Sequence, residues 1–239
     1  MFVHYRTQGF ILKKEDRGEA NQLFTFYTKD FGKLEILGRA IRKISSKLRS
    51  GAEIFYLLEI EFIQTKAHKT LTDAISIEKF ENIRKDLRKL RIAYKISELL
   101  DNLIRGQESD ENIWNLLNEV FNKLNNLKLE IKNWKLEIIY YYFLWNLLSI
   151  LGYQLELYHC ILCQKKLLPE KLYFDSKTGG IICQNCFQKT KSGKEIDLET
   201  VKILRLILEK NWQILLRLKI DVKHLKSLEY FSESYLSRV

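Results

Sequence analysis

Hydrophobic residues alternate with polar ones over much of the first 80 residues, and the period becomes helical after Phe80. The first part is rich in β-branched and aromatic residues, and it breaks at Asp30-Phe31-Gly32 as a hairpin does. Its strand-like segments are YRTQGFILKK, QLFTFYTKDFGKLEILGRAI, AEIFYLLEIEFIQTK and KTLTDAISIEKF. We therefore expect five short strands over residues 1–80, arranged as a small β-barrel or sandwich.

Two helices are predicted next. The first covers residues 87–106 and ends at Gly106. Its expected apolar face consists of Leu90, Ala93, Tyr94, Ser97, Leu100 and Ile104. Ser109 or Asp110 caps the second helix, because a short polar side chain can accept the unpaired N–H groups of a first turn. The apolar face of this helix consists of Ile113, Leu116, Leu117, Val120, Phe121 and Leu124.

Residues 134–152, WKLEIIYYYFLWNLLSILG, are apolar almost all round. Such a helix belongs at the centre of a helical domain. Its most apolar part, residues 138–152, is shorter than a membrane span and contains Asn146, so we expect a buried helix and no membrane partner. Two further helices are expected over residues 197–218 and 221–236.

All four cysteines lie in one segment, residues 158–188, as two CxxC pairs: Cys160, Cys163, Cys183 and Cys186. Each CxxC turn can place two thiolates on one side of a tetrahedral metal, and this spacing is that of a zinc ribbon. Gly179 and Gly180 would let the chain turn back toward the metal. The pattern predicts one structural Zn²⁺ per chain.

Other uses of the cysteines are less consistent with the sequence. A catalytic zinc needs an open position, which four thiolates do not leave. A redox CxxC is expected near a βαβ pattern, and none is evident. His159 could replace one ligand, but we expect a surface role for it. We read no signal peptide at the start of the chain, so we expect a reducing, cytoplasmic setting that favours metal over disulfides.

The 239-residue chain carries a net charge of +10, which indicates a polyanionic partner. The charge is concentrated in residues 33–49 and 84–95, each with six basic residues, one acid and a net charge of +5. The candidate phosphate contacts in them are Lys33, Arg39, Arg42, Lys43, Lys47, Arg49, Arg84, Lys85 and Arg88. The segment 84–95 could equally be a solvated helix face. For residues 33–49 we favour DNA binding, because a basic strand and loop on a small barrel is a common platform for single strands.

Aromatic residues near the first basic segment could stack on bases. They are Phe24, Phe26, Tyr27 and Phe31. We expect most of them to fill the barrel instead, because alternation points every second side chain inward. No phosphate-binding glycine loop, nucleophile elbow or HExxH motif is present, and the four histidines are scattered, so we expect a protein that is not an enzyme.

The order of these parts resembles that of the RecO family of bacterial recombination mediators. The resemblance covers nearly the whole chain and is carried by the order and spacing of several segments. They are YRTQGFIL, DRGEANQLFTFYTKDFGKL, GRAIRKISSKLRSG, LLEIEF, SILGYQLELYHCILC and GGIICQNC. The resemblance implies an α+β fold, with an N-terminal OB-fold barrel (1–80) and an α-helical domain (81–239) that carries the zinc segment 158–188.

The resemblance also implies a function in DNA repair and recombination. Members of this family bind single- and double-stranded DNA and anneal complementary strands. With RecR, they help load the recombinase RecA onto DNA coated by single-strand binding protein, whose C-terminal tail they bind, in the RecF pathway. The family's basic DNA contacts fall on Lys33, Arg39, Arg42 and Lys43, and its metal ligands fall on the four cysteines. We expect a cytoplasmic, nucleoid-associated mediator. The alternatives are an RNA-binding module with an OB-fold and a zinc ribbon, and an enzyme that uses the zinc.

Overall fold

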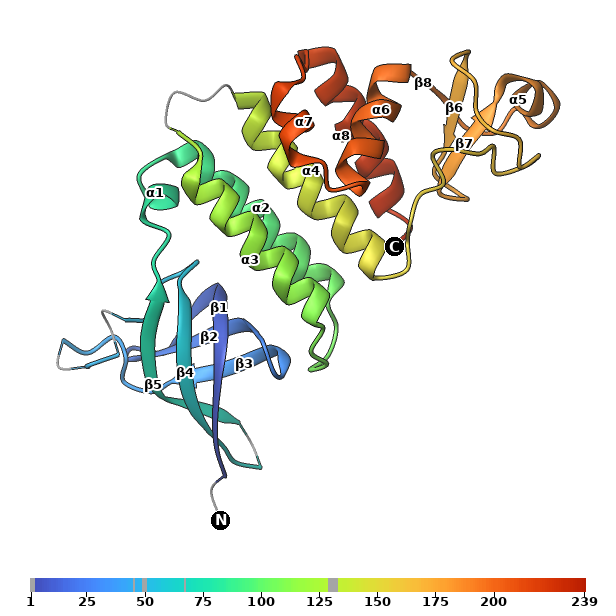
Figure 1. The fold of residues 1–239 in the computed structure, drawn as a ribbon. Coiled ribbons are helices and arrows are strands. Elements are labelled where there is room, and N and C mark those ends of the chain that lie inside the picture. Colours follow the sequence, from blue (N-terminus) through green and yellow to red (C-terminus); the bar gives the residue numbers. More distant parts are fainter. Residues whose placement is uncertain (1–2, 45, 49–50, 67, 129–132) are drawn as a thin grey trace. The chain divides into compact units, whose positions relative to one another are not determined.

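The structure is a computed structural model that describes residues 3–44, 46–48, 51–66, 68–128 and 133–239 (Figure 1). The chain forms two compact units, Met1–Leu129 and Glu130–Val239. The first unit combines a β-barrel with helices, and the second combines helices with a small sheet. The mixed α+β class predicted from the sequence is confirmed.

The N-terminal barrel is closed by five strands in the order β1-β2-β3-β5-β4. They are β1 (Val3–Arg17), β2 (Asn21–Thr28), β3 (Gly32–Gly38), β4 (Leu57–Gln64) and β5 (Lys69–Glu78). The long strand β1 pairs with both β2 and β4, and an irregularity between Ile11 and Lys13 lets it turn from one partner to the other. Strand β3 meets β5 in parallel at Leu37 and Thr70, which completes the circuit of an OB-fold.

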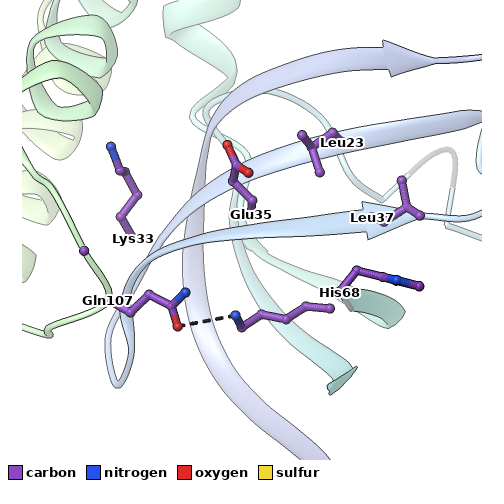
Figure 2. Close-up of a pocket in the computed structure, with 8 residues that line it drawn as sticks. Leu23, Lys33, Glu35, Leu37, His68 and Gln107 are labelled. Carbon is purple, nitrogen blue, oxygen red and sulfur yellow. Dashed lines mark hydrogen bonds between the residues drawn. The ribbon is translucent and has the colours of Figure 1, made fainter. Parts of the chain in front are cut away.

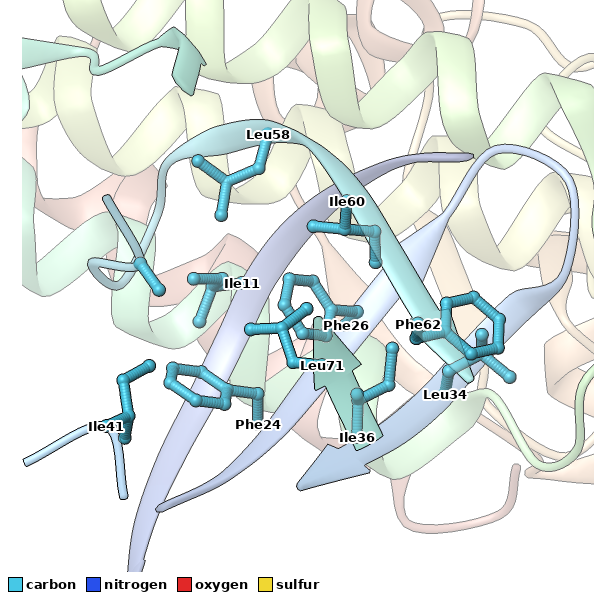
Figure 3. Packing of buried hydrophobic residues seen from close by; sticks show 11 residues of the cluster. Ile11, Phe24, Phe26, Leu34, Ile36, Ile41, Leu58, Ile60, Phe62 and Leu71 are labelled. Carbon is cyan, nitrogen blue, oxygen red and sulfur yellow. The ribbon is translucent and has the colours of Figure 1, made fainter. Parts of the chain in front are cut away.

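The interior of the barrel is apolar because alternate residues of each strand point inward. On β3, for example, Leu34 and Ile36 are buried while Glu35 is exposed. Figure 3 shows how the inward side chains meet. The core cluster consists of Ile11, Phe24, Phe26, Leu34, Ile36, Ile41, Ala52, Leu58, Ile60, Phe62 and Leu71.

The four aromatic residues considered as base-stacking candidates are largely occupied. Phe24 and Phe26 lie fully inside the barrel. Phe31 is half-buried, and its ring meets Phe62 edge-on. Tyr27 points out of the barrel but is buried, and its hydroxyl approaches the carbonyl of Asp110. The expectation that most of them fill the barrel is confirmed for Phe24 and Phe26 in its core and for Phe31, which packs against that core.

Helices α1 (Glu81–Arg84), α2 (Leu87–Leu103) and α3 (Glu111–Asn126) pack with the barrel in the first unit, although the barrel itself ends near residue 80. Of the two predicted caps, Ser109 and Asp110, it is Asp110 that caps α3, by accepting the N–H groups of Asn112 and Ile113. The six residues predicted to form the apolar face of α3 are all buried. On the barrel side, the ring of Phe10 packs against Trp114 and Phe121 of this helix.

The predicted apolar face of α2 was partly wrong. Tyr94 is 49% exposed, and its ring meets that of Phe55 at an interplanar angle of 79°. The buried face instead includes Lys89, Ile92, Ile96 and Leu99, which the helical pattern had placed elsewhere. The buried face of α2 is rotated from the predicted one. The helix packs mainly against α1, α3 and β1, and those neighbours decide which of its side chains are covered.

Lys89 is a fully buried cation whose ammonium group caps the C-terminal end of α3. Its Nζ donates to the carbonyl oxygens of Asn125 (3.1 Å) and Leu127 (2.5 Å), two acceptors at the C-terminal end of that helix. A cation is favourable there because the last carbonyls of a helix lack partners and carry partial negative charge. Burial lowers the pKa of Lys89 below its ordinary value.

Replacing Lys89 with Met should lower the free energy of unfolding by about 1–3 kcal/mol, since two carbonyls lose a charged donor. Urea unfolding measures this, with the exposed Lys85→Met as the matched control. In the wild type, the pKa of Lys89 is lower in the folded chain than in the unfolded chain, so the unfolded chain holds the ammonium proton more tightly. Stability should therefore rise as the pH approaches 10.5, and the Met variant should lack that rise. Equal stability of the two Met variants would contradict this role.

The second unit is built around α4 (Asn133–Ile150), eleven of whose residues are buried. The side-chain amide of Asn146 donates to the carbonyl of Tyr142 within α4 and to that of Ile207. Asn146 thus joins two helices inside the unit. In the described residues, no helix is both long enough and apolar enough to cross a membrane.

Three helices pack near α4: α6 (Leu198–Leu208), α7 (Trp212–Arg217) and α8 (Val222–Leu236). The prediction of a single helix over residues 197–218 was wrong. The chain breaks at Lys210, whose φ of 56° is left-handed. The N–H of Asn211 then bonds to the carbonyl of Leu206, and the side chain of Asn211 caps α7. The apolar pattern continued through this turn because both helices bury residues in the same unit.

A three-stranded sheet and a short helix form the cysteine-containing ribbon. They are β6 (Leu172–Asp175), β7 (Gly180–Cys183), α5 (Gln184–Thr190) and β8 (Lys194–Ile196), with the sheet order β7-β6-β8. Gly179 has a φ of +72°, and a Cβ there would stand 2.7 Å from the Tyr235 hydroxyl. Glycine is therefore required both for the turn into β7 and for its approach to α8.

Candidate metal centre and nucleic-acid interface

The four cysteines come together at one end of the ribbon. Cys160 and Cys163 lie on a tight turn, in which the N–H of Gln164 bonds to the carbonyl of Cys160. Cys183 ends β7, and Cys186 lies in the first turn of α5. The four Sγ atoms all lie within 4.8 Å of one another. The gathering predicted from the CxxC spacing is confirmed.

These positions suit a tetrahedral metal ion. Zn–S bonds of about 2.3 Å in a tetrahedron place the sulfurs about 3.8 Å apart, and the Sγ atoms of Cys163 and Cys183 are 3.9 Å apart. Cys160 is fully buried, and its Sγ accepts the backbone N–H of Cys183 at 3.4 Å. Sulfur ligands that also accept backbone N–H groups are typical of supported metal sites.

The protonation behaviour of the thiols agrees with this geometry. Burial opposes ionisation of Cys160, but the backbone N–H groups of Cys163, Cys183 and Leu162 lower its pKa to about 6. Burial and the neighbouring thiols raise the pKa of Cys186 to about 12. Four sulfurs this close can all be ionised together only around a cation. The donor set therefore fits a metal ion.

His159 is exposed and lies outside the cluster. Its Nδ1 is 3.6 Å from a carboxylate oxygen of Glu156, which also accepts the backbone N–H of His159. His159 was expected at the surface or beside the metal ligands, and not as a ligand; its exposed position outside the cluster agrees with that expectation.

Most of the first basic segment is exposed in the turn that follows β3. Arg39, Arg42, Lys43 and Lys47 all lie at the surface there, while Ile41 between them is buried in the barrel. Arg42 pairs with Asp16 at 3.2 Å, and Arg39 Nη2 lies 2.6 Å from His68 Nε2. Arg49, also a candidate, lies outside the described residues.

Lys33 differs from the exposed candidates after β3 because it is half-buried and bonded to a helix. It is half-buried on β3, and its Nζ donates to the carbonyl oxygen of Asp101 at 2.6 Å and to its carboxylate at 3.1 Å. Asp101 lies in the last turn of α2, where a cation is stabilised by the helix end. Lys33 thus connects the barrel to α2.

The three candidate phosphate contacts of the second basic segment are paired with acids. Arg84 contacts Glu53 (3.3 Å) and lies over the ring of Tyr56, and Lys85 pairs with Glu81 at 3.2 Å. Arg88 donates two hydrogen bonds to Asp86, at 3.0 and 2.7 Å. These hydrogen bonds lower the pKa of Asp86, which also caps α2. These three cations contribute to helix structure and are less available to phosphates than the cations after β3.

An open pocket of about 390 Å³ lies on the outer face of β2 and β3 (Figure 2). Leu23 and Leu37, which are direct partners across the two strands, give it an apolar wall, and Glu35 stands beside them. Its other lining residues are Lys33, His68, Lys69, Gly106 and Gln107. Lys69 donates to the side chain of Gln107 at 3.3 Å.

The pocket connects with the basic turn through the contact between His68 and Arg39. Leu23, Glu35, His68 and Gln107 were not identified from the sequence. The outward register of β2 and β3 could have indicated the first two, because they alternate with the buried core residues. Nothing local connects residue 107 with strands some 70 residues earlier.

These features define a class of protein: an OB-fold barrel with a basic turn, joined in one chain to a helical unit with a tetracysteine metal-binding ribbon. Comparison with known proteins agrees. The family model for the recombination protein O N terminal matches residues 1–80, and that for the recombination protein O C terminal matches residues 84–239. The chain belongs to the RecO family of DNA repair and recombination proteins.

Individual relatives support this assignment. The DNA repair protein RecO of Dehalococcoides mccartyi (strain ATCC BAA-2266 / KCTC 15142 / 195) is 32% identical over 94% of this chain and 86% of its own length. RecO of Caldanaerobacter subterraneus subsp. tengcongensis is 26% identical over 90% of this chain and 84% of its own. RecO of Roseiflexus sp. (strain RS-1) is 26% identical over 98% and 81%.

Proposed function

We propose that this chain is a recombination mediator that acts by binding DNA and not by catalysis. It binds single- and double-stranded DNA and anneals complementary strands. With RecR, it helps load RecA onto DNA coated by single-strand binding protein in the RecF pathway, and it binds the C-terminal tail of that coating protein. A protein with this activity works where the chromosome is, at the nucleoid in the cytoplasm.

One observation carries the proposal: four exposed cations follow β3 of an OB-fold, and the first of them, Arg39, contacts His68 in the wall of an open pocket on β2 and β3. The four cations are Arg39, Arg42, Lys43 and Lys47. OB-folds bind oligonucleotides on the β2–β3 face and on the β1–β2 and β4–β5 loops. Arg39 reaches this region through His68, which lies between β4 and β5. Lysines and arginines that neutralise phosphates release counterions, which supplies affinity with little dependence on sequence. Two strands bound at neutralised surfaces can then approach each other.

The cysteine cluster is proposed to hold one structural Zn²⁺. Cys160, Cys163, Cys183 and Cys186 would all be ligands, and the ion would supply a crosslink within the ribbon. The hydrogen bond from the N–H of Cys183 to Cys160 Sγ and the pairing of β6 with β7 then keep the two CxxC turns facing each other. Four sulfur ligands leave no open position for water.

Strand annealing with the purified chain tests the function. Complementary strands should pair much faster with the protein than without it, both as bare DNA and as DNA coated by single-strand binding protein. Acceleration on bare DNA alone would contradict the mediator role. Tighter binding to RNA than to DNA of equal length would favour an RNA-binding module instead.

A further inference from the structure

The second unit has a basic surface of its own, which we call the α8 face and define as Lys194, Lys223, Lys226 and Tyr230. Residues 130–239 contain 17 Lys and Arg against 12 Asp and Glu, so half of the chain's net charge of +10 belongs to this unit. Lys223, Lys226 and Tyr230 follow one another at spacings of three and four on α8, so they are neighbours along one side of the helix. All three are exposed.

Lys194 joins this row from the ribbon. Its Nζ lies 3.6 Å from the centre of the Tyr230 ring. The arrangement is held by packing: Lys194 pairs with Phe174 across β8 and β6, and the ring of Phe174 meets that of Phe231 on α8 at 5.2 Å. The cation therefore has a fixed place beside α8 as long as the ribbon is folded.

The lysines of the α8 face make no ion pair within the described residues, although Glu229 lies three residues after Lys226 and Glu233 three residues after Tyr230 on the same helix. Both carboxylates also act on Tyr141 of α4: burial raises the pKa of Tyr141 most, and Glu229 and Glu233 raise it further. The lysine side chains are exposed and make no ion pair there, so nothing in the fold requires three cations to be gathered at this place.

We propose that the α8 face is a second binding site for single-stranded DNA, formed entirely by residues outside the barrel. Neighbouring cations on one side of a helix suit the repeating phosphates of a strand. An aromatic ring beside them, here Tyr230 at 45% exposure, is what proteins use to stack on bases. One chain would then hold one strand at the barrel and another at the α8 face, which goes beyond the proposed barrel site and provides the second strand for annealing.

The test uses the full chain and short labelled single strands. The α8 variant replaces Lys194, Lys223 and Lys226 with Gln. A matched control replaces three other exposed lysines of the same unit: Lys177, Lys202 and Lys210. Both variants lose the same charge. The α8 variant should lower the slope of log affinity against log salt by about 2, at about 0.7 for each lost phosphate contact. The control should lower it much less, and both should melt like the wild type.

Combining the changes separates this proposal from the barrel site. A chain altered at Arg39, Arg42 and Lys43 should keep residual binding, which the α8 changes then remove. Equal slopes for the α8 variant and its control would overturn the proposal and leave the barrel function intact. If the α8 changes abolish binding of an oligoglutamate peptide but leave DNA binding unchanged, the face is a peptide site and the proposal is wrong. A wild-type chain that binds no DNA would overturn both.

Discussion

Cys160→Ser should remove the metal and unfold the ribbon. Cys160 is the most buried of the four cysteines, and its sulfur also accepts the N–H of Cys183, so a serine would weaken both the metal bonds and the link between the two CxxC turns. Binding energies of structural zinc in small domains are about 10–16 kcal/mol, and such energy is folding energy. We expect this to be the largest stability effect of any single substitution in the chain.

Metal analysis and thermal melting measure this effect together. Wild-type protein should contain one zinc per chain, and Cys160→Ser should contain much less and melt earlier in the second unit. His159→Ala is the matched control, because this exposed neighbour lies outside the cluster and should leave zinc and melting unchanged. Folded wild-type protein with four freely titratable thiols and no metal would show that the cluster has another use.

Replacing Arg39, Arg42 and Lys43 with Ala should strongly weaken binding of single strands at moderate salt. Each lost phosphate contact lowers the salt slope by about 0.7, so the slope should fall by about 2. Thermal stability should hardly change. The three side chains are exposed, and the pair between Arg42 and Asp16 is a surface ion pair, worth at most about 1 kcal/mol.

A control with the same loss of charge replaces Lys29, Lys79 and Lys128, three exposed lysines of the first unit. It should keep nearly the full salt slope, because removing charge at a distance is screened by salt. If both triple variants bind alike, the turn after β3 is only a solvated surface. The DNA path would then lie on another surface, and Arg84, Lys85 and Arg88 would be the next residues to change.

The two largest predictions depend on information of different kinds. The gathering of the four cysteines was predictable, because two CxxC turns each determine local geometry and a tetrahedral metal site would require them to face each other. The DNA surface was predictable only in outline. Charge density identified both basic segments, but it could not show that Arg84, Lys85 and Arg88 have acidic partners while Lys43 and Lys47 are exposed.

Lys33 and Lys89 illustrate the same limit. Both are lysines in basic runs, and the sequence treats them like their neighbours. In the folded chain, Lys33 donates to Asp101, 68 residues away, and Lys89 donates to the carbonyl of Asn125, 36 residues away at the end of α3. A cation's partner is set by which chain segments meet in space, and charge counting along the chain contains no such information.

The sequence by itself determined the strand alternation, the start of α3 near Ser109 and Asp110, the order of the parts and the gathering of the four cysteines. Each depends on neighbours within a few residues or on the geometry of a CxxC turn. Only the tertiary structure decided that Tyr94 is exposed, that the helix breaks at Lys210, and that Leu23, Glu35 and Gln107 share a pocket. These outcomes depend on packing between segments distant in the chain, which decides the faces that are covered and the side chains that meet.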